Sequence, residues 1–216
     1  MKRRFSFVLL LALMLSIFGV GYAQTTVTIG EGTSSQQYPF HSWYGFGRSL
    51  SLYTYDQIGS LGNITSLSWD VATTCTVPIP YKIYIATTTE PALSQMTWAN
   101  FTDMATMVKE GSYTFDTAGW HTFLLDFPFN YSGSNLLVGV EANYGNGGTG
   151  YNNNPYFRYT SGASETHQWW RADYNAPTGL GTLNSSLPNL QMAIMPISDE
   201  PICVVNPASW DFGLQM

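Results

Sequence analysis

Residues 64–71 read ITSLSWDV, and apolar side chains alternate with polar ones along most of this stretch. In a β-strand, successive side chains point to opposite faces of the sheet. Alternation with this period therefore predicts a half-buried strand. One face would carry Thr65, Leu67, Trp69 and Val71, and the other would carry Ser66, Ser68 and Asp70.

The same alternation recurs along the rest of the chain. Residues 81–86 (YKIYIA), 121–127 (HTFLLDF) and 135–142 (NLLVGVEA) each place apolar side chains on one face of a strand. These faces consist of Tyr81, Ile83 and Ile85, then Phe123, Leu125 and Phe127, then Leu136, Val138 and Val140. Further strands are predicted at residues 25–29, 48–53, 107–115, 156–159, 167–171 and 190–195.

Clusters of Gly, Asn and Pro separate these strands, as expected for turns. The one helical pattern, at residues 92–104, predicts a turn or two of helix inside a crossover loop. About ten strands, short turns and one longer crossover predict an all-β fold. The architecture that fits is an antiparallel β-sandwich of jelly-roll type.

The first 23 residues have the pattern of a secretory signal peptide. Lys2, Arg3 and Arg4 precede an apolar run, and small residues at Gly21 and Ala23 suit cleavage before residue 24. A membrane anchor is the alternative, but the run over residues 5–20 is shorter than the roughly 20 apolar residues that a spanning helix needs. We therefore expect an exported protein that is secreted or located at the cell surface.

Removal of the signal peptide leaves five basic residues against fourteen acidic ones, a net charge of −9. Such a chain repels phosphate backbones and anionic lipids, which argues against a nucleic-acid partner. Membrane association is expected only through the anchoring of a longer chain.

The strand pattern stops near Pro196, so we assign residues 24–196 to the β-sandwich domain. Residues 197–216 read as a linker and the incomplete start of a following Ig-like domain, with an extra strand of the sandwich as the alternative. An exported chain permits a disulfide between Cys75 and Cys203. We favour two buried or free thiols, because the two cysteines fall in different segments.

No catalytic motif is found in the sequence. It contains no zinc-protease, nucleophile-elbow or phosphate-loop signature, and its three histidines stand apart from any nucleophile motif. We therefore expect no catalytic residues, no metal site and no cofactor. The weak exception is a pair of acids, Glu141 and Asp126, which lie on separate predicted strands and would have to meet in space to hydrolyse a glycoside.

The segment HQWWRAD, residues 167–173, places two tryptophans side by side. In a strand they must face opposite ways. The face of Trp169 also carries His167 and Arg171, and burying these together is costly. We therefore assign Trp170 to the core and Trp169 to an outward face, where it either stacks on Arg171 or meets a ligand.

Aromatic residues also gather in two predicted loops, around Tyr44 and around Tyr151. Exposed rings near polar groups offer rigid, amphipathic contact area for a ligand. The candidate ligand-binding residues are Trp169, Arg171, His167, Tyr44 and Tyr151. For most other rings, packing in the core is the simpler explanation.

Several segments, in order, resemble a known β-sandwich module. They include TIGEGTSSQQYPF, YGFGRSLSLYTYDQIGSLGNITSLSW, FPFNYSGSNLLVGVEANYG and HQWWRADYNAPTG, and the resemblance covers about residues 26–195. The module is an N-terminal part of large secreted or surface proteins of Bacteroidetes-like or Cloacimonadota-like bacteria. The tail PASWDFG resembles the opening of an Ig-like domain of the choice-of-anchor or ASH type. The resemblance implies an extracellular, non-catalytic role by analogy.

Two functional hypotheses of different class follow. The first is an exported, non-catalytic module for carbohydrate binding or cell-surface adhesion, with a polysaccharide or surface glycan as partner. The second is a structural spacer or accessory domain of a larger surface protein or secreted hydrolase, with no ligand of its own. A hydrolase that uses Glu141 or Asp126 ranks behind both.

Overall fold

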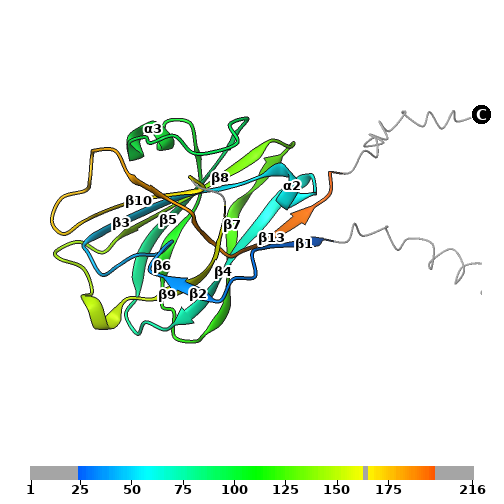
Figure 1. Ribbon diagram of the computed structural model, residues 1–216. Coiled ribbons are helices and arrows are strands. Elements are labelled where there is room, and N and C mark those ends of the chain that lie inside the picture. Colours follow the sequence, from blue (N-terminus) through cyan, green and yellow to red (C-terminus); the bar gives the residue numbers. More distant parts are fainter. Residues whose placement is uncertain (1–23, 163–164, 198–216) are drawn as a thin grey trace, which may run out of the picture.

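The computed structural model describes residues 24–162 and 165–197, which form two antiparallel β-sheets packed face to face (Figure 1). The antiparallel β-sandwich predicted from the sequence is thus confirmed. The predicted signal peptide and the tail with Cys203 lie outside the described residues.

Sheet A contains four strands of the jelly roll in the order β1–β13–β4–β7. Their bounds are Thr25–Ile29 (β1), Leu190–Met195 (β13), Gly62–Thr73 (β4) and Gly119–Tyr131 (β7). Sheet B contains the other four, in the order β3–β8–β5–β6. These are Phe46–Tyr53 (β3), Asn135–Asn143 (β8), Ile79–Thr88 (β5) and Thr106–Tyr113 (β6).

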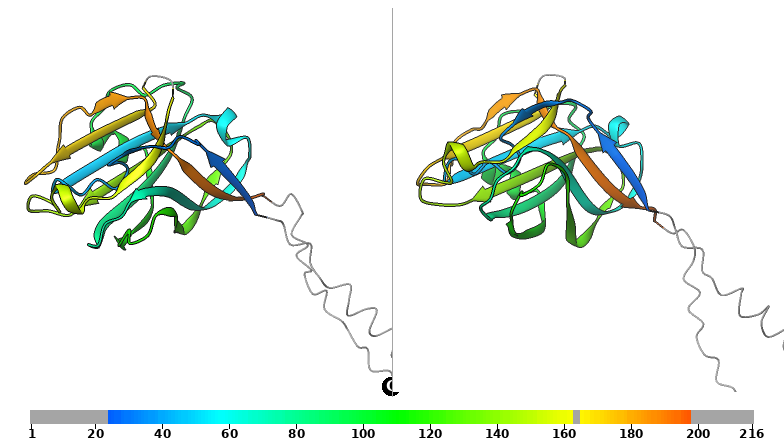
Figure 2. Two further views of the ribbon diagram at one scale, coloured as in Figure 1. Left: turned by 60° about the horizontal axis from the view of Figure 1, so that its bottom comes forward. Right: turned by 90° about the horizontal axis from the view of Figure 1, so that it is seen from below.

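The chain passes repeatedly from one sheet to the other. It runs from β1 in sheet A to β3 in sheet B, back to β4, across to β5 and β6, and then through β7 and β8 before it closes on β13. This order places the last strand between β1 and β4, as in a jelly roll built from two Greek keys. The views in Figure 2 show the two sheets from below and obliquely.

An insertion between β8 and β13 widens both sheets. It contributes Tyr156–Ser161 (β9) and Ser186–Pro188 (β12) to sheet A, and His167–Ala172 (β10) and Thr182–Asn184 (β11) to sheet B. The short strand Ser34–Gln36 (β2) pairs with β9. Strand β10 pairs with β3, and its Trp169 stacks on Tyr38 of the segment that precedes β3.

The core between the sheets follows the predicted alternation. Tyr81, Ile83 and Ile85 of β5 and Leu136, Val138 and Val140 of β8 all lie in one buried apolar cluster. Phe40, which precedes β3, is fully buried in the same cluster. Burial of these faces is the main driving force that holds the two sheets together.

The quoted strand departs from the prediction in two respects. It is not half-buried, because Ser66, Ser68 and Asp70 of the predicted polar face are buried as well. The second departure is at Thr65. Ile64 and Leu67 are both fully buried, whereas Thr65 is half-buried.

Against β13, Thr65 is the extra residue of a β-bulge between Ile64 and Ser66. Against β7 the register also shifts between Ile64 and Ser66, and there residues 125–128 of β7 lie between the partners of these two residues. On β7 the same irregularity leaves Phe127 51 % exposed, contrary to the predicted apolar face.

A second apolar cluster covers the outer face of sheet B. The helix α3, Trp98–Thr102, forms within the predicted helical stretch, and the side chain of Thr97 caps it by accepting a hydrogen bond from the Asn100 backbone N–H. The cluster consists of Leu50, Leu52, Ala86, Leu93, Trp98, Phe101, Leu137 and Trp170. Both faces of sheet B are therefore covered over part of their area. The other short helix, α2, spans Tyr55–Ile58.

Candidate functional site

Three loops meet at the end of the sandwich where β3 begins. They are residues 37–45 before β3, residues 144–155 between β8 and β9, and residues 173–181 after β10. The side-chain oxygen of Asn154 accepts hydrogen bonds from the backbone N–H groups of Ser42 (2.8 Å) and Trp43 (2.9 Å). The Gly147 N–H donates to the Asp173 carbonyl at 3.2 Å. These bonds fix the three loops against one another.

One glycine makes this contact feasible. Gly148 has a φ of +73°, and a Cβ at this position would lie 2.3 Å from the carbonyl oxygen of Trp43. Only glycine takes this backbone conformation without strain and allows so close an approach. The Asn- and Gly-rich loop, which the sequence shows only as a turn signal, is thus a fixed part of the site.

A continuous chain of ring contacts crosses this end of the molecule. Tyr151 meets Trp43 edge-on at 4.9 Å between ring centroids, and Trp43 meets Tyr44 at 5.7 Å. The guanidinium carbon of Arg171 lies 4.8 Å from the ring centroid of Tyr44 and 4.9 Å from that of Trp169. The cation is therefore in contact with both rings.

The chain continues into the interior. Trp169 stacks on Tyr38 at 5.6 Å, and the Tyr38 ring contacts both His41 (4.9 Å) and His167 (5.4 Å). We call this set the ring cluster: Tyr38, His41, Trp43, Tyr44, Tyr151, His167, Trp169 and Arg171. All five residues predicted to bind a ligand belong to it, although they come from three separate segments.

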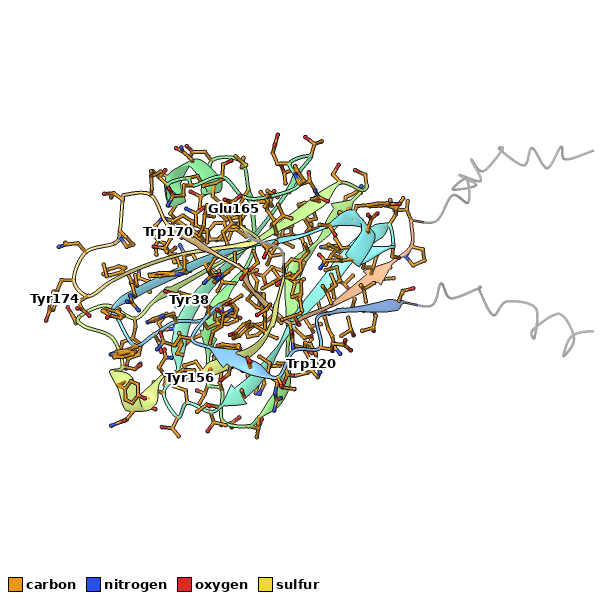
Figure 3. The ribbon with its side chains drawn as sticks, in the orientation of Figure 1. Tyr38, Trp120, Tyr156, Glu165, Trp170 and Tyr174 are labelled. Carbon is orange, nitrogen blue, oxygen red and sulfur yellow. The ribbon has the colours of Figure 1, made fainter. Side chains whose placement is uncertain are left out.

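The ring cluster has an open side and a buried side. Tyr151 is 62 % exposed, Arg171 is exposed, and Trp43, Tyr44 and Trp169 are half-buried. Tyr174, on the adjacent loop, projects at the same end of the molecule (Figure 3). The open side presents ring edges and a cation that solvent and solutes can reach.

His167 occupies a different place from the one predicted. It is fully buried, with its Nδ1–H donating to the Asn184 side-chain oxygen at 3.0 Å. It is the register partner of Ser51, while Trp169 is the partner of Ser49, and both serines share a face of β3 with the core residue Tyr53. The face of His167 and Trp169 thus points toward sheet A.

The two tryptophans are therefore not divided simply into inside and outside. Trp170 is buried as predicted, but in the outer cluster under α3, where its indole N–H donates to the Gly179 carbonyl at 3.1 Å. Trp169 lies on the opposite face, half-buried at the edge of the space between the sheets. Trp169 was predicted to face outward because one face of the strand was expected to be exposed to solvent. In the structure, both faces of β10 are partly covered.

The buried side of the ring cluster is polar and unusually poor in hydrogen bonds. Tyr38 Oη, both ring nitrogens of His41 and Nε2 of His167 are buried without a hydrogen-bond partner among the described residues. Burial, and after it the charge of Arg171, lowers the pKa of His41 to about 3. Burial also lowers the pKa of His167 to about 4, although the bond with Asn184 opposes this. Both imidazoles are neutral at neutral pH.

The two acids considered for glycoside hydrolysis, Glu141 and Asp126, each form an ion pair with a different basic residue. Glu141 accepts two hydrogen bonds from Arg48, at 2.9 and 2.6 Å, on the outer face of sheet B. Asp126 pairs with Lys109 at 2.5 Å. Glu141 and Asp126 are thus bound to different cations and belong to different sheets. Within the described part of the chain, no group of three or more His, Cys, Asp or Glu residues is placed to hold a metal ion.

Three members of the ring cluster were not predicted from the sequence: Tyr38, His41 and Trp43. A signal was present, because all three lie in the aromatic run YPFHSWYGF over residues 38–46. What the run cannot show is which of its rings turn inward. Phe40 enters the apolar core while its neighbours Tyr38 and His41 join the ring cluster.

Comparisons with known proteins carry no argument about this chain. No family model matches the chain, and no curated protein matches it. One similar solved structure is that of the cysteine protease and lectin-like domains of Cwp84, a surface layer associated protein of Clostridium difficile. The TM-score is 0.42 with 8 % sequence identity, over 71 % of this chain and 33 % of that one. The chain thus spans about a third of that structure, and a likeness at this level supports no argument about function.

The described residues include no helix that is long and apolar enough to cross a membrane.

Proposed function

We propose that this domain is an exported, non-catalytic module that binds carbohydrate through the open side of the ring cluster. The observation that carries the proposal is the row formed by Tyr151, Trp43, Tyr44 and Arg171, accessible at one end of the sandwich and fixed by hydrogen bonds between loops. Rings held in this way provide apolar area for the flat face of a sugar at little cost in conformational entropy.

Polar groups surround these rings. Asn152 is exposed next to Tyr151, and Asp173 is half-buried next to Tyr174. Sugar hydroxyls need both donors and acceptors, which amide, carboxylate and guanidinium groups supply together. The site is a loop-end surface on a rigid scaffold, which is a common location for binding residues.

The test compares wild type with Tyr151→Ala in native gels that contain neutral soluble polysaccharides. We expect retardation of the wild-type chain by at least one polysaccharide and loss of retardation in the variant, because Tyr151 is the most exposed ring of the cluster. Tyr55→Ala is the matched control, since Tyr55 is 44 % exposed and follows β3 at the opposite end of that strand.

Equal retardation of wild type and Tyr151→Ala would remove the ring cluster from the binding site. Failure of every polysaccharide to retard the wild-type chain would overturn the proposal and favour the structural spacer, which has no ligand of its own.

A further inference from the structure

A second group of side chains lies in a row across the outer face of sheet A. Trp120 of β7 is the register partner of Asp70 of β4, so both side chains project from the same face. Arg158 of β9 reaches Asp70 from the other side, with its Nη1 2.8 Å from the Asp70 Oδ1. Three strands therefore place an indole, a carboxylate and a guanidinium next to one another.

A hollow of about 460 Å³ opens at this row. Its other wall is the loop between β1 and β2, which contributes residues 30–33, and Asn189 contributes from the segment before β13. Tyr38 is a member of the ring cluster, and Figure 3 shows that Trp120 lies well away from it. The hollow and the ring cluster thus occupy different parts of the surface.

The loop that forms the wall is held in place. The hydroxyl of Thr160 accepts hydrogen bonds from the backbone N–H groups of Glu31 (3.0 Å) and Gly32 (2.8 Å). The Asn189 amide donates to the Gly32 carbonyl at 2.9 Å. A Cβ on Gly32 would lie 2.1 Å from the Tyr159 carbonyl oxygen, so only glycine lets the loop pass this close to β9. The hollow is therefore a fixed feature of the surface.

The groups around the hollow differ in chemistry and complement one another. Trp120 is 38 % exposed and offers part of a flat apolar face. The ion pair engages Nη1 of Arg158 and Oδ1 of Asp70, while the Arg158 side chain remains 37 % exposed. A paired guanidinium and carboxylate offer adjacent donors and acceptors, which match two neighbouring hydroxyl groups. Glu31 and Thr33 add polar groups at the rim.

We propose that this hollow is a second saccharide site, which binds one sugar ring by stacking on Trp120 and by hydrogen bonds to two adjacent hydroxyls, one that donates to Asp70 and one that accepts from Arg158. Its ligand is a neutral sugar, because the ion pair already balances the charges at its base. The inference goes beyond the proposed function, since it gives the module two sites on different faces. Two weak sites on one module raise the avidity for a polymer that reaches both.

The test uses the full chain with 15N-labelled tryptophan and follows the indole N–H signals in NMR spectra. The probes are the methyl glycosides of glucose, galactose and mannose. The Trp120 signal is assigned by its absence in Trp120→Phe. We expect it to shift saturably with at least one glycoside in wild type, and equally in Tyr151→Ala, which alters only the ring cluster.

Arg158→Lys keeps the charge opposite Asp70 but removes the planar guanidinium. We expect it to weaken binding at Trp120 by about tenfold or more, as for the loss of one charge-assisted hydrogen bond. Arg171→Lys is the matched control, because it makes the same change in the ring cluster, and it should leave the Trp120 titration unchanged.

Each outcome separates the two sites. A Trp120 signal that responds to none of the three glycosides overturns the second site. If the signals of Trp43 and Trp169 shift in the same titrations, the ring cluster still stands. A Trp120 shift that Tyr151→Ala abolishes also overturns the second site, because the response would then originate in the ring cluster.

Discussion

The apolar core and the ring cluster both contain aromatic side chains that pack between the two sheets, but they are built differently. Phe40 in the core contacts five other rings, which are those of Trp69, Tyr81, Phe115, Phe123 and Phe157. Tyr38, two residues earlier, contacts two histidines and Trp169 and buries a hydroxyl with no hydrogen-bond partner among the described residues. One short segment thus supplies both regions.

The apolar core and the ring cluster differ in whether their buried polar atoms have hydrogen-bond partners. Close packing of apolar rings stabilises a fold and leaves no group unsatisfied. Burial of polar atoms without hydrogen bonds costs stability, so a region that does so is not optimised for folding alone. Strain or cost of this kind concentrates at functional sites. The binding role proposed for the ring cluster would account for this cost.

The largest expected effect is on the core. Phe40→Ala removes a fully buried ring and should lower the free energy of unfolding by about 3–5 kcal/mol. Trp169→Ala removes a larger but half-buried ring and should cost only about 1–2 kcal/mol. Urea unfolding followed by circular dichroism measures both. Equal losses would mean that the ring cluster is as much a part of the core as Phe40.

The second prediction concerns acid stability. His41 and His167 have pKa values of about 3 and 4 in the fold, below the ordinary value of 6.5. The unfolded chain therefore binds more protons between these values, so stability is full above pH 6.5 and falls as the pH drops toward 4. Each histidine contributes a slope of up to about 1.4 kcal/mol per pH unit.

Urea unfolding at several pH values between 7 and 4 tests this slope. The double variant His41→Gln, His167→Gln should show a flatter dependence than wild type, because these two side chains then no longer take up protons on unfolding. An unchanged slope in the double variant would show that the two imidazoles accept protons in the fold as readily as in the unfolded chain.

Much of the fold could be predicted from the sequence because period-two alternation records which face of a strand is buried. The alternation placed β5 and β8 correctly, and the bounds of β1 and β13 matched residue for residue. The bulge at Thr65 was not predicted. An extra residue moves the side chains of the preceding residues to the opposite face of the strand, and nothing in ITSLSWDV indicates the position of that residue.

Five of the eight members of the ring cluster could be predicted from the sequence, but the depth at which they lie could not. Alternation predicted that Trp169 and Trp170 point to opposite faces of the strand. It could not predict that α3 covers one face of β10 and that the segment with Tyr38 covers the other. The row of Asp70, Trp120 and Arg158 was missed altogether. Its residues lie on three strands that are far apart in the sequence. Only the pairing of these strands in the sheet brings the three side chains together.

The third prediction compares two buried tyrosines. The Tyr53 hydroxyl donates to the Pro188 carbonyl at 2.9 Å, so Tyr53→Phe should cost about 1–2 kcal/mol by removing a buried hydrogen bond. Tyr38→Phe removes a buried hydroxyl without a partner and should leave the free energy of unfolding unchanged or raise it slightly. Thermal unfolding of both variants is a sufficient measurement. A loss in Tyr38→Phe as large as that in Tyr53→Phe would contradict the contrast between the two regions.

The smallest effect is expected for the cation in the ring cluster. Arg171 contacts the faces of Tyr44 and Trp169 while exposed to solvent, and such contacts contribute about 0.5–1 kcal/mol. Each single change also alters packing, so a double-mutant cycle with Arg171→Gln and Tyr44→Leu is needed to isolate the interaction energy between Arg171 and the Tyr44 ring. We expect a coupling energy within this range in urea unfolding. A coupling near zero would mean that the contacts of Arg171 with the two rings do not stabilise the fold.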